Sequence, residues 1–187
     1  MRVIGIVGSP RVNGNTEILT RHTLGAIEEE GLDTELICLA KMDIRPCNAC
    51  MVCKMEESCP IDDDLFPLYT KIKAAEAIVL ASPVYFSAVS GLMKSFMDRA
   101  GYIAKNNKAF TGKVGGPLVV ARRGGANFTF SELLLWYYIL GFNIPGSTYW
   151  NIAFGGDRGE VSNDEEGLTN AWNFGKNVAY LVKKLKT

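Results

Sequence analysis

The sequence contains only one histidine, His22, and this scarcity narrows the chemistry that the chain can support. A Ser–His–Asp triad or a Cys–His pair needs a histidine that is placed to accept the proton of the nucleophile. His22 falls in a stretch whose apolar residues have helical spacing, which indicates a packing or surface role. The sequence therefore gives no reason to expect histidine-based hydrolysis or acyl transfer.

The chain also lacks an excess of charge of either sign and a long apolar run. Its 20 basic and 20 acidic residues give a formal net charge of +0, which offers no general attraction to nucleic acid or to anionic membranes. The most apolar stretch, Leu133–Leu140, is far shorter than a membrane span and indicates a buried helix or a subunit contact. Met1–Gly8 is apolar but lacks the features of a signal peptide, so we expect a cytoplasmic protein.

What the sequence does have is a cluster of thiols. Four of its five cysteines form a C-x2-C-x2-C-x5-C-P run from Cys47 to Pro60. Bacterial ferredoxins use the run C-x2-C-x2-C-x3-C-P to bind iron–sulfur clusters, and its last gap is shorter. The spacing alone leaves three interpretations open: an iron–sulfur cluster, tetrahedral zinc, and free thiols or a redox disulfide. Cys38 lies in a strand pattern and is interpreted as a small buried apolar residue.

Apolar strands alternate with amphipathic helices along the chain, which is typical of a parallel sheet with right-handed crossovers. We expect an α/β fold, a flavodoxin-like, three-layer, doubly wound structure with a five-stranded parallel sheet. Residues 1–187 would form one domain with a cysteine-rich insertion loop at 46–60. The predicted strands are Arg2–Val7, Thr34–Leu39, Ala77–Ala81, Val114–Ala121 and Ser147–Ile152. The predicted helices are Thr16–Glu30, Asp62–Ala75, Ser90–Ala104, Phe128–Leu140 and Leu168–Lys184.

The loop Gly8–Thr16 joins the first strand to the first helix at the edge where such sheets bind ligands. It contains neither G-x-G-x-x-G nor a Walker sequence. It does offer groups that suit a phosphate monoester: two hydroxyls, two amides, a cation and free N–H groups at a helix start. The alternative is an ordinary capped turn, with Asn15 or Thr16 as the N-cap and a positive φ at Gly14.

Two further loops are expected at the same edge. After the third strand, Tyr85 and Phe86 suit stacking on a flat aromatic ligand, or else form a rigid turn before a helix capped by Ser90. After the fourth strand, Gly124 and Gly125 let the backbone approach a ligand closely, with Arg122 or Arg123 beside them, or else form a solvated turn. Residues 155–167 are polar and glycine-rich, and are interpreted as a solvated loop or a flap.

Three separated segments resemble the NADPH-dependent FMN reductase-like branch of the flavodoxin superfamily, and more narrowly the iron–sulfur flavoproteins. They are Gly8-Ser-Pro-Arg11 with Gly14-Asn-Thr16, Ser82-Pro-Val-Tyr85 with Ser90-Gly-Leu-Met-Lys-Ser-Phe-Met-Asp-Arg99, and the run Cys47–Cys59 leading into Asp62-Asp63. They occur in the order typical of the family. The first two are specific for FMN-type flavodoxin folds, and the cysteine run narrows the resemblance.

The resemblance implies two cofactors. FMN would be held at its phosphate by Ser9, Arg11, Asn13, Asn15 and Thr16. Its isoalloxazine ring would lie against Pro83, Val84, Tyr85 and Phe86 and be approached by Gly124 and Gly125. A [4Fe–4S] cluster would be held by Cys47, Cys50, Cys53 and Cys59. The family also implies a homodimer or homotetramer, in which the cluster of one subunit can face the flavin of another.

We therefore expect an FMN-dependent oxidoreductase with an auxiliary cluster and no catalytic side chain, because the flavin carries the chemistry. The resemblance implies ferredoxin or NAD(P)H as donor and quinones, oxygen or peroxide as acceptors. Since a dinucleotide fingerprint is missing, NAD(P)H would dock transiently over the exposed ring. Two alternatives stay open: a cluster-free NAD(P)H:quinone or FMN reductase, and a non-catalytic electron carrier or metal-stabilised binding module.

Overall fold

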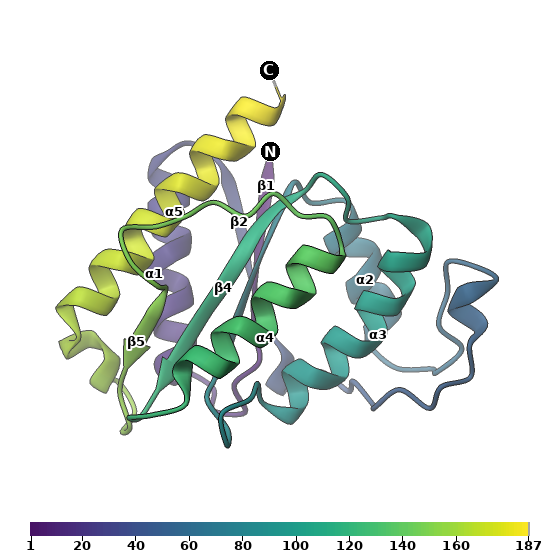
Figure 1. Ribbon diagram of the computed structural model, residues 1–187, viewed down its shortest axis with the longest axis horizontal. Helices are drawn as coiled ribbons and strands as arrows, with labels where there is room; N and C mark the ends of the chain where they lie inside the picture. Colours follow the sequence, from purple (N-terminus) through teal and green to yellow (C-terminus); the bar gives the residue numbers. More distant parts are fainter. Residues whose placement is uncertain (187) are drawn as a thin grey trace.

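The structure is a computed structural model that describes residues 1–186, and in them five strands alternate with helices (Figure 1). The strands are β1 (Arg2–Val7), β2 (Asp33–Cys38), β3 (Ala77–Pro83), β4 (Val114–Ala121) and β5 (Ile152–Phe154). The α-helices are α1 (Asn15–Glu29), α2 (Leu65–Lys73), α3 (Gly91–Asn107), α4 (Ala126–Ile139) and α5 (Glu165–Lys186). Short 3-10 helices are η1 (Leu39–Lys41), η2 (Val52–Lys54) and η3 (Glu160–Asn163).

All five strands are parallel and lie in the order β2-β1-β3-β4-β5, which confirms the predicted flavodoxin-like α/β fold. The chain leaves β1 towards β2 and leaves β3 in the opposite direction, so the strand order reverses between β1 and β3. Ligands of doubly wound sheets bind beside such a switch point, outside the carboxyl ends of the strands. Those ends lie along the lower edge of the sheet in Figure 1.

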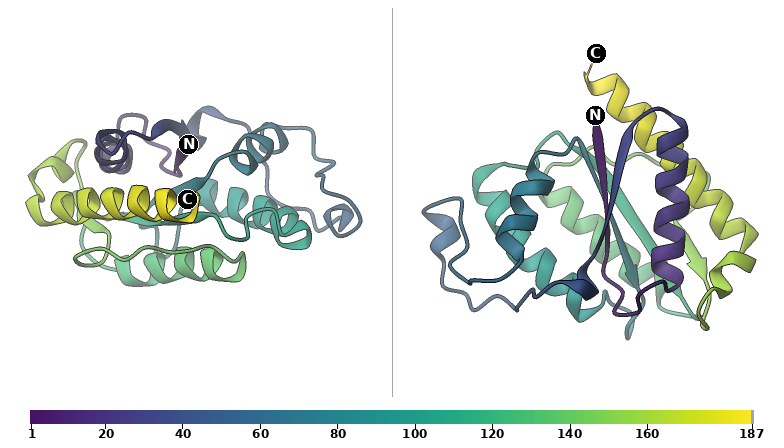
Figure 2. Two further views of the ribbon diagram at one scale, coloured as in Figure 1. Left: turned by 90° about the horizontal axis from the view of Figure 1, so that it is seen from above. Right: turned by 180° about the vertical axis from the view of Figure 1, so that it is seen from behind.

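Side chains on the two faces of the sheet enter two separate cores, because successive residues of a strand point to opposite faces. Ile4 and Ile6 of β1 pack with α2, α3 and α4, whereas Val3 packs with α1 and α5. Ile78 and Leu80 of β3 face the first core, and its intervening residues face the second. Both faces are therefore covered by helices, which gives three layers (Figure 2).

Tyr137 locks α4 onto the sheet. Its hydroxyl accepts a hydrogen bond from the backbone N–H of Leu80 at 2.8 Å and lies 3.0 Å from the carbonyl oxygen of Gly116. A Cβ at Gly115 would come within 2.8 Å of the Tyr137 ring and 2.2 Å of the Ile78 carbonyl oxygen. Glycine at 115 therefore makes room for a tyrosine to reach between β3 and β4, and Tyr137 belongs to the core and not to a subunit contact.

The fifth strand is where the predicted elements fail most clearly. We predict it over Ser147–Ile152, but β5 begins only at Ile152 and pairs with the last three residues of β4. The hydroxyls of Ser147 and Thr148 donate hydrogen bonds to Asn170 of α5, at 2.8 and 2.7 Å. Ser147 and Thr148 are therefore fixed to a helix by their side chains and do not extend the strand.

Two helix starts also differ from the prediction. The residue that caps α1 is Gly14, with φ −87°, and the positive φ belongs to Asn13 at 54°. The helix α2 begins at Leu65, and not at Asp62, because Asp63 accepts hydrogen bonds from Leu65, Arg45 and Arg99. The aspartates before α2 thus connect loops to helices instead of forming its first turn.

The cysteine-rich loop projects beyond α2 and α3, as Figures 1 and 2 show from opposite sides. No residue from Arg45 to Pro60 is buried, in contrast to the sheet. In the described part of the chain, residues 1–186, none of the helices has both the length and the apolar character that a membrane crossing requires.

Candidate functional site

The loop after β1 is anchored to both neighbouring elements. The N–H of Gly8 donates to the carbonyl oxygen of Ala81 at the end of β3, at 2.8 Å. Ser90 caps α3, as predicted, by accepting a hydrogen bond from the N–H of Met93 at 3.1 Å. The same Ser90 hydroxyl donates to the carbonyl oxygen of Gly8. The two loops that flank the switch point are therefore joined by one buried hydroxyl.

A cavity opens between these loops at the carboxyl edge of the sheet. It brings together seven residues that we predict to hold a cofactor: Ser9, Arg11, Asn15, Thr16, Pro83, Val84 and Tyr85. Residues that the resemblance did not name complete its walls, and they are Val120, Arg122, Gly155 and Gly156. Polar groups from the start of α1 thus share one cavity with the apolar residues that follow β3.

Four predicted residues lie outside this lining: Asn13, Phe86, Gly124 and Gly125. The N–H of Asn13 donates to the buried carboxylate of Glu17 at 2.7 Å. Phe86 is fully exposed at 105%. A Cβ on Gly125 would lie 2.6 Å from the hydroxyl oxygen of Ser87, so this glycine lets the loop after β4 approach the turn after β3. Whether these four contact a bound cofactor stays a prediction.

Asn15 and Arg11 both reach a distant segment, residues 155–161, which we call the strap. The amide nitrogen of Asn15 donates to the carbonyl oxygen of Asp157 at 2.7 Å, and its amide oxygen accepts from the N–H of Gly159 at 2.8 Å. The guanidinium of Arg11 donates to the carbonyl oxygen of Gly156 at 3.1 Å. The strap is therefore part of the cavity wall, and Asn15 holds it instead of presenting a free amide.

A strained turn positions Tyr85. The N–H of Tyr85 donates to the carbonyl oxygen of Ala88 at 2.9 Å, and the reverse bond between the two residues measures 3.0 Å. Between them, Phe86 and Ser87 have φ of 50° and 63°, in the left-handed region that non-glycine residues rarely adopt. Such strain persists where the surroundings enforce it, and it is concentrated at ligand sites.

The walls of this cavity suit FMN. Within residues 1–186 no side chain caps the start of α1, so backbone N–H groups at its positive end are left for an anion. Ser9 and Thr16 are 5% and 2% exposed and add hydroxyls, and Arg11 adds the cation that a phosphate requires. Pro83, Val84 and the 43% exposed Tyr85 supply a flat, largely apolar surface beside them. These donors match a phosphate tail, and the apolar wall matches an aromatic ring.

The second candidate site lies on the projecting loop, where all four clustered cysteines line one cavity. Its inner wall is α3, which contributes Arg99, Tyr102 and Ile103. In residues 1–186 the cysteines form no disulfide. The backbone is left-handed at Ala49 and at Met51, with φ of 56° and 64°. These two reversals turn the chain so that Cys47, Cys50 and Cys53, which follow one another at intervals of three residues, line the same cavity.

Several contacts tie this loop to its surroundings. The N–H of Ala49 donates to the Cys47 sulfur at 3.4 Å, and the side-chain amide of Asn106 donates to the Cys53 carbonyl oxygen at 3.0 Å. Arg99 Nη2 lies 3.1 Å from the Cys59 sulfur. Burial, and then the charges of Cys47 and Cys50, raise the pKa of the Cys53 thiol. The neutral form of the Cys53 thiol is therefore favoured until a cation compensates the charge of its thiolate.

The donor set fits an iron–sulfur cluster, because it offers four thiols on one cavity. Among the described residues 1–186, no group of three or more His, Cys, Asp or Glu side chains is arranged to hold one metal ion. A group bound by all four thiols would lie in the cavity that they share. Arg99 Nε is buried and has no hydrogen-bond partner in the described chain, which leaves a donor at the cavity wall. These features fit a cluster, which takes four thiolates and is stabilised by nearby donors.

Comparisons with known proteins identify the family of this chain. Residues 1–157 match the family described as NADPH-dependent FMN reductase. An iron-sulfur flavoprotein of Methanocaldococcus jannaschii is 42% identical over 198 residues and is covered completely, as is this chain. An iron-sulfur flavoprotein of Archaeoglobus fulgidus is 34% identical over 198 residues, with 98% of each chain covered.

The chain belongs to the NADPH-dependent FMN reductase family. Within this family it belongs to the iron–sulfur flavoproteins, as the motifs predict, and it is a flavin-dependent oxidoreductase with FMN as its cofactor. Solved structures share the fold at lower identity. RosB with a bound flavin intermediate has a TM-score of 0.79 at 18% identity, with 100% of this chain and 80% of RosB covered. An archaeal flavodoxin has a TM-score of 0.66 at 17% identity, with 98% and 99% covered.

Proposed function

We propose that this family member transfers electrons between a reduced donor and a quinone- or oxygen-type acceptor, with a [4Fe–4S] cluster on Cys47, Cys50, Cys53 and Cys59 beside its FMN. The observation that carries the proposal is that the four thiols of the projecting loop line one cavity against α3. When bound, FMN exchanges one or two electrons and the cluster exchanges one, so the two cofactors together can couple one-electron and two-electron partners.

On the flavin side, the residues bind and orient. Ser9, Thr16 and the start of α1 offer donors to the phosphate, and Arg11 offers a counter-charge. Pro83, Val84 and Tyr85 support the ring. Arg122 lines the same cavity, and its positive charge would stabilise negative charge on the reduced ring. Asn13, Phe86, Gly124 and Gly125 are proposed to approach FMN through the adjoining turns.

The donor and acceptor are proposed from the family resemblance. Ferredoxin or NAD(P)H would reduce the protein, and the exposed positions of Tyr85 and Phe86 leave room for NAD(P)H to dock without a fingerprint of its own. Anaerobic oxidation of NADPH, NADH and reduced ferredoxin should identify the donor, with a quinone as acceptor. If none of the three donors reduces the FMN-loaded protein, the proposal is excluded, and a non-catalytic binding module is favoured instead.

The cofactor content tests the proposal directly. Protein purified and reconstituted without oxygen should contain FMN and about four iron atoms with acid-labile sulfide per chain. Protein without FMN affinity would contradict the flavin assignment. If protein prepared without oxygen contains FMN but no iron, the cluster is excluded and the flavin assignment stands.

A second candidate is a cluster-free NAD(P)H:quinone or FMN reductase. The observation that favours it is the match of residues 1–157 to the NADPH-dependent FMN reductase family. In this case the thiols are structural or redox-active, and reductase activity should survive replacement of all four by serine. Loss of quinone reduction by ferredoxin in that variant would instead support the cluster.

We also propose a homodimer or homotetramer in the cytoplasm. The outer surface of α4 exposes apolar side chains that lack a cover in residues 1–186, and they are Phe128, Leu135, Tyr138 and Ile139 at 72, 66, 79 and 59%. A second copy would remove this area from water. Light scattering should show two or four chains, and a monomer at micromolar concentration would contradict the proposal.

A further inference from the structure

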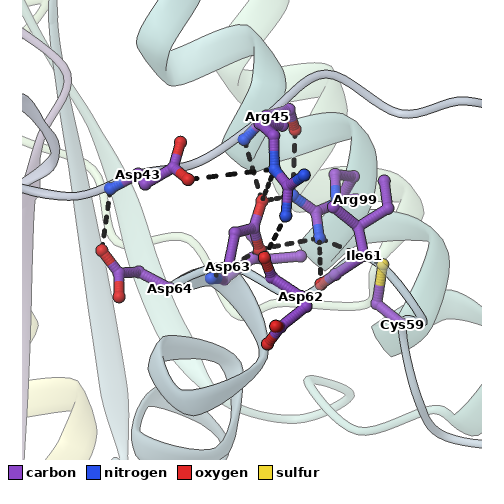
Figure 3. Close-up of polar contacts among 9 residues, drawn as sticks. Asp43, Arg45, Cys59, Ile61, Asp62, Asp63, Asp64 and Arg99 are labelled. Carbon is purple, nitrogen blue, oxygen red and sulfur yellow. Dashed lines mark hydrogen bonds and ion pairs between the residues drawn. The ribbon is translucent and has the colours of Figure 1, made fainter.

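Arg99 is an unusually buried cation beside the cysteine cavity. Its side chain is 1% exposed, and it forms an ion pair with Asp63, whose side chain is 0% exposed. Arg99 lies on α3 and Asp63 on the loop before α2, so the pair joins a helix to the segment that leads out of the cysteine run. Figure 3 shows the guanidinium between the Asp63 carboxylate and Cys59.

The guanidinium is held in one orientation by several partners. Nη1 donates to Asp63 and to the Arg45 carbonyl oxygen at 2.9 Å, and Nη2 donates to Asp63 at 3.0 Å. Asp63 is fixed in turn by the N–H groups of Arg45 and Leu65, at 2.9 and 3.1 Å. Because Asp63 and the Arg45 carbonyl oxygen fix the planar guanidinium of Arg99, its Nη2 is kept 3.1 Å from the Cys59 sulfur.

A structural ion pair alone does not account for this arrangement. Removing two charges from water is costly, and an apolar pair of similar size often serves stability as well. Here the cation lines the same cavity as the four thiols, touches one of their sulfurs and keeps Nε without a partner. The positive charge of Arg99 therefore lies where it would act on a group bound by the four cysteines.

We propose that Arg99 is a positioning residue that sets the reduction potential of the cluster through its hydrogen bond to Cys59, while Asp63 holds its orientation and partly cancels its charge. The inference rests on the proposed cluster. An electron added to the cluster increases its negative charge, and a donor with positive charge beside a ligating sulfur stabilises that reduced form. Arg99 therefore raises the potential, and Asp63 limits the increase.

The two members of the pair should shift the potential in opposite directions. In Arg99→Gln the donor charge is lost and the Asp63 charge remains, so the potential becomes more negative. In Asp63→Asn the guanidinium charge is no longer balanced, so the potential becomes less negative. For each we expect at least a tenfold change in the equilibrium of one-electron reduction, which corresponds to about 59 mV.

The experiment is an anaerobic redox titration, followed by electron paramagnetic resonance, of reconstituted wild type and variants with measured iron content. Arg99→Lys is included because it keeps the charge and lets the protein fold if Arg99→Gln does not; it should give an intermediate potential. The matched control is Lys94→Gln, which removes an exposed cation of the same helix that pairs with Asp98 and leaves the potential unchanged.

Opposite shifts of the Arg99 and Asp63 variants at full iron content support the proposal. Three outcomes would show that the pair only holds the loop in place. They are equal potentials in all variants, shifts of the same sign in Arg99→Gln and Asp63→Asn, and loss of iron from both of these variants. Wild type that retains FMN but binds no iron would overturn the proposed cluster and this inference together, and the iron assay separates that result from the others.

Discussion

The two cavities are built in different ways. The strand-end cavity is formed by loops whose key side chains are buried, with Ser9 and Thr16 at 5% and 2% exposure and Ser90 at 1%. The cysteine cavity has α3 as one wall, but its other wall is the loop from Arg45 to Pro60, in which no residue is buried. The sheet and its cores therefore hold the first site, whereas the second is a surface loop of which Cys53 and Cys59 pack, partly buried, against the first core.

This difference indicates where each site obtains its stability. The flavin cavity is fixed by the same packing that folds the sheet, so it should exist before FMN binds. No residue of the cysteine loop is itself buried, and binding of a metal group by four thiolates would add to its folding free energy. A substitution at one site should consequently change the content of its own cofactor, FMN or iron, and leave the content of the other unchanged.

The largest effect should come from the cysteines. Cys53→Ser removes one ligand, and we expect iron to fall from about four atoms per chain to near zero while FMN stays bound. Iron and flavin assays on the same sample measure both. Cys38→Ser is the control, since Cys38 lies on β2 outside the cavity. Joint loss of FMN and iron in Cys53→Ser would contradict the independence of the two sites.

A smaller effect is expected at the phosphate end of the flavin cavity. Arg11→Ala removes a charge-assisted hydrogen bond of about 1.5–3 kcal/mol, which weakens FMN binding about 10- to 150-fold. Fluorescence titration of the metal-free protein measures the dissociation constant. Arg2→Ala is the matched control, because Arg2 begins β1 at the end opposite to the loop that carries Arg11, and it should leave FMN binding unchanged. An unaltered constant for Arg11→Ala would show that Arg11 serves the strap alone.

The strap should respond to Asn15. In Asn15→Ala the side-chain bonds to Asp157 and Gly159 are lost, and two partly buried backbone groups lose their partners. We expect a loss of about 1–3 kcal/mol in the free energy of unfolding and faster hydrogen exchange over 155–161. Exchange measured by mass spectrometry should show no change in the cysteine loop. Uniform acceleration along the chain would mean that the strap is not a separate unit.

The smallest effect concerns pH. Burial opposes it, but hydrogen bonds from Arg99, Arg45 and Leu65 lower the pKa of Asp63 below its usual value near 4. Since the folded pKa is depressed, the stabilisation is complete above the unfolded pKa and is lost as pH falls through the folded one. Urea unfolding of the metal-free protein should show an added slope of at most about 1.4 kcal/mol per pH unit below pH 4.

The variant Asp63→Asn removes that part of the acid slope. If wild type and Asp63→Asn lose stability in parallel between pH 5 and pH 3, the carboxylate is not linked to folding as its contacts indicate. Lower stability of the variant at neutral pH is expected in addition, because Arg99 then stays buried without its counter-charge.

Much of the fold could be predicted because it is encoded locally. Apolar runs of strand length and helical spacing place four of the five strands and all five helices to within a few residues. The cap of α3 was also predictable, since a serine before a helix commonly accepts its N–H bond. The failure at β5 has a non-local cause: Ser147 and Thr148 form hydrogen bonds to a residue of α5.

The residues of the candidate sites could likewise be predicted where local motifs identify them, but not where distant contacts place them. Motifs in the loops after β1 and β3 identify seven cavity residues, but they do not show that Asn15 holds the strap. Gly155, whose Cβ would lie 2.7 Å from the N–H nitrogen of Val161, could have been found only from its glycine-rich context. Sequence reasoning left Arg122 and Arg123 open as the cation after β4, and the cavity lining includes Arg122.

The sequence by itself determined the order of strands and helices, the loops that meet at the carboxyl edge, and the spacing of four thiols, because these depend on residue periods and on turn chemistry. Only the tertiary structure decided the partners of the polar side chains. The crossovers bring Arg99 to Asp63, 36 residues earlier in the chain, and Asn15 to Asp157, 142 residues later. Local sequence does not specify such contacts, since they arise only when separate helices and loops pack against the same sheet.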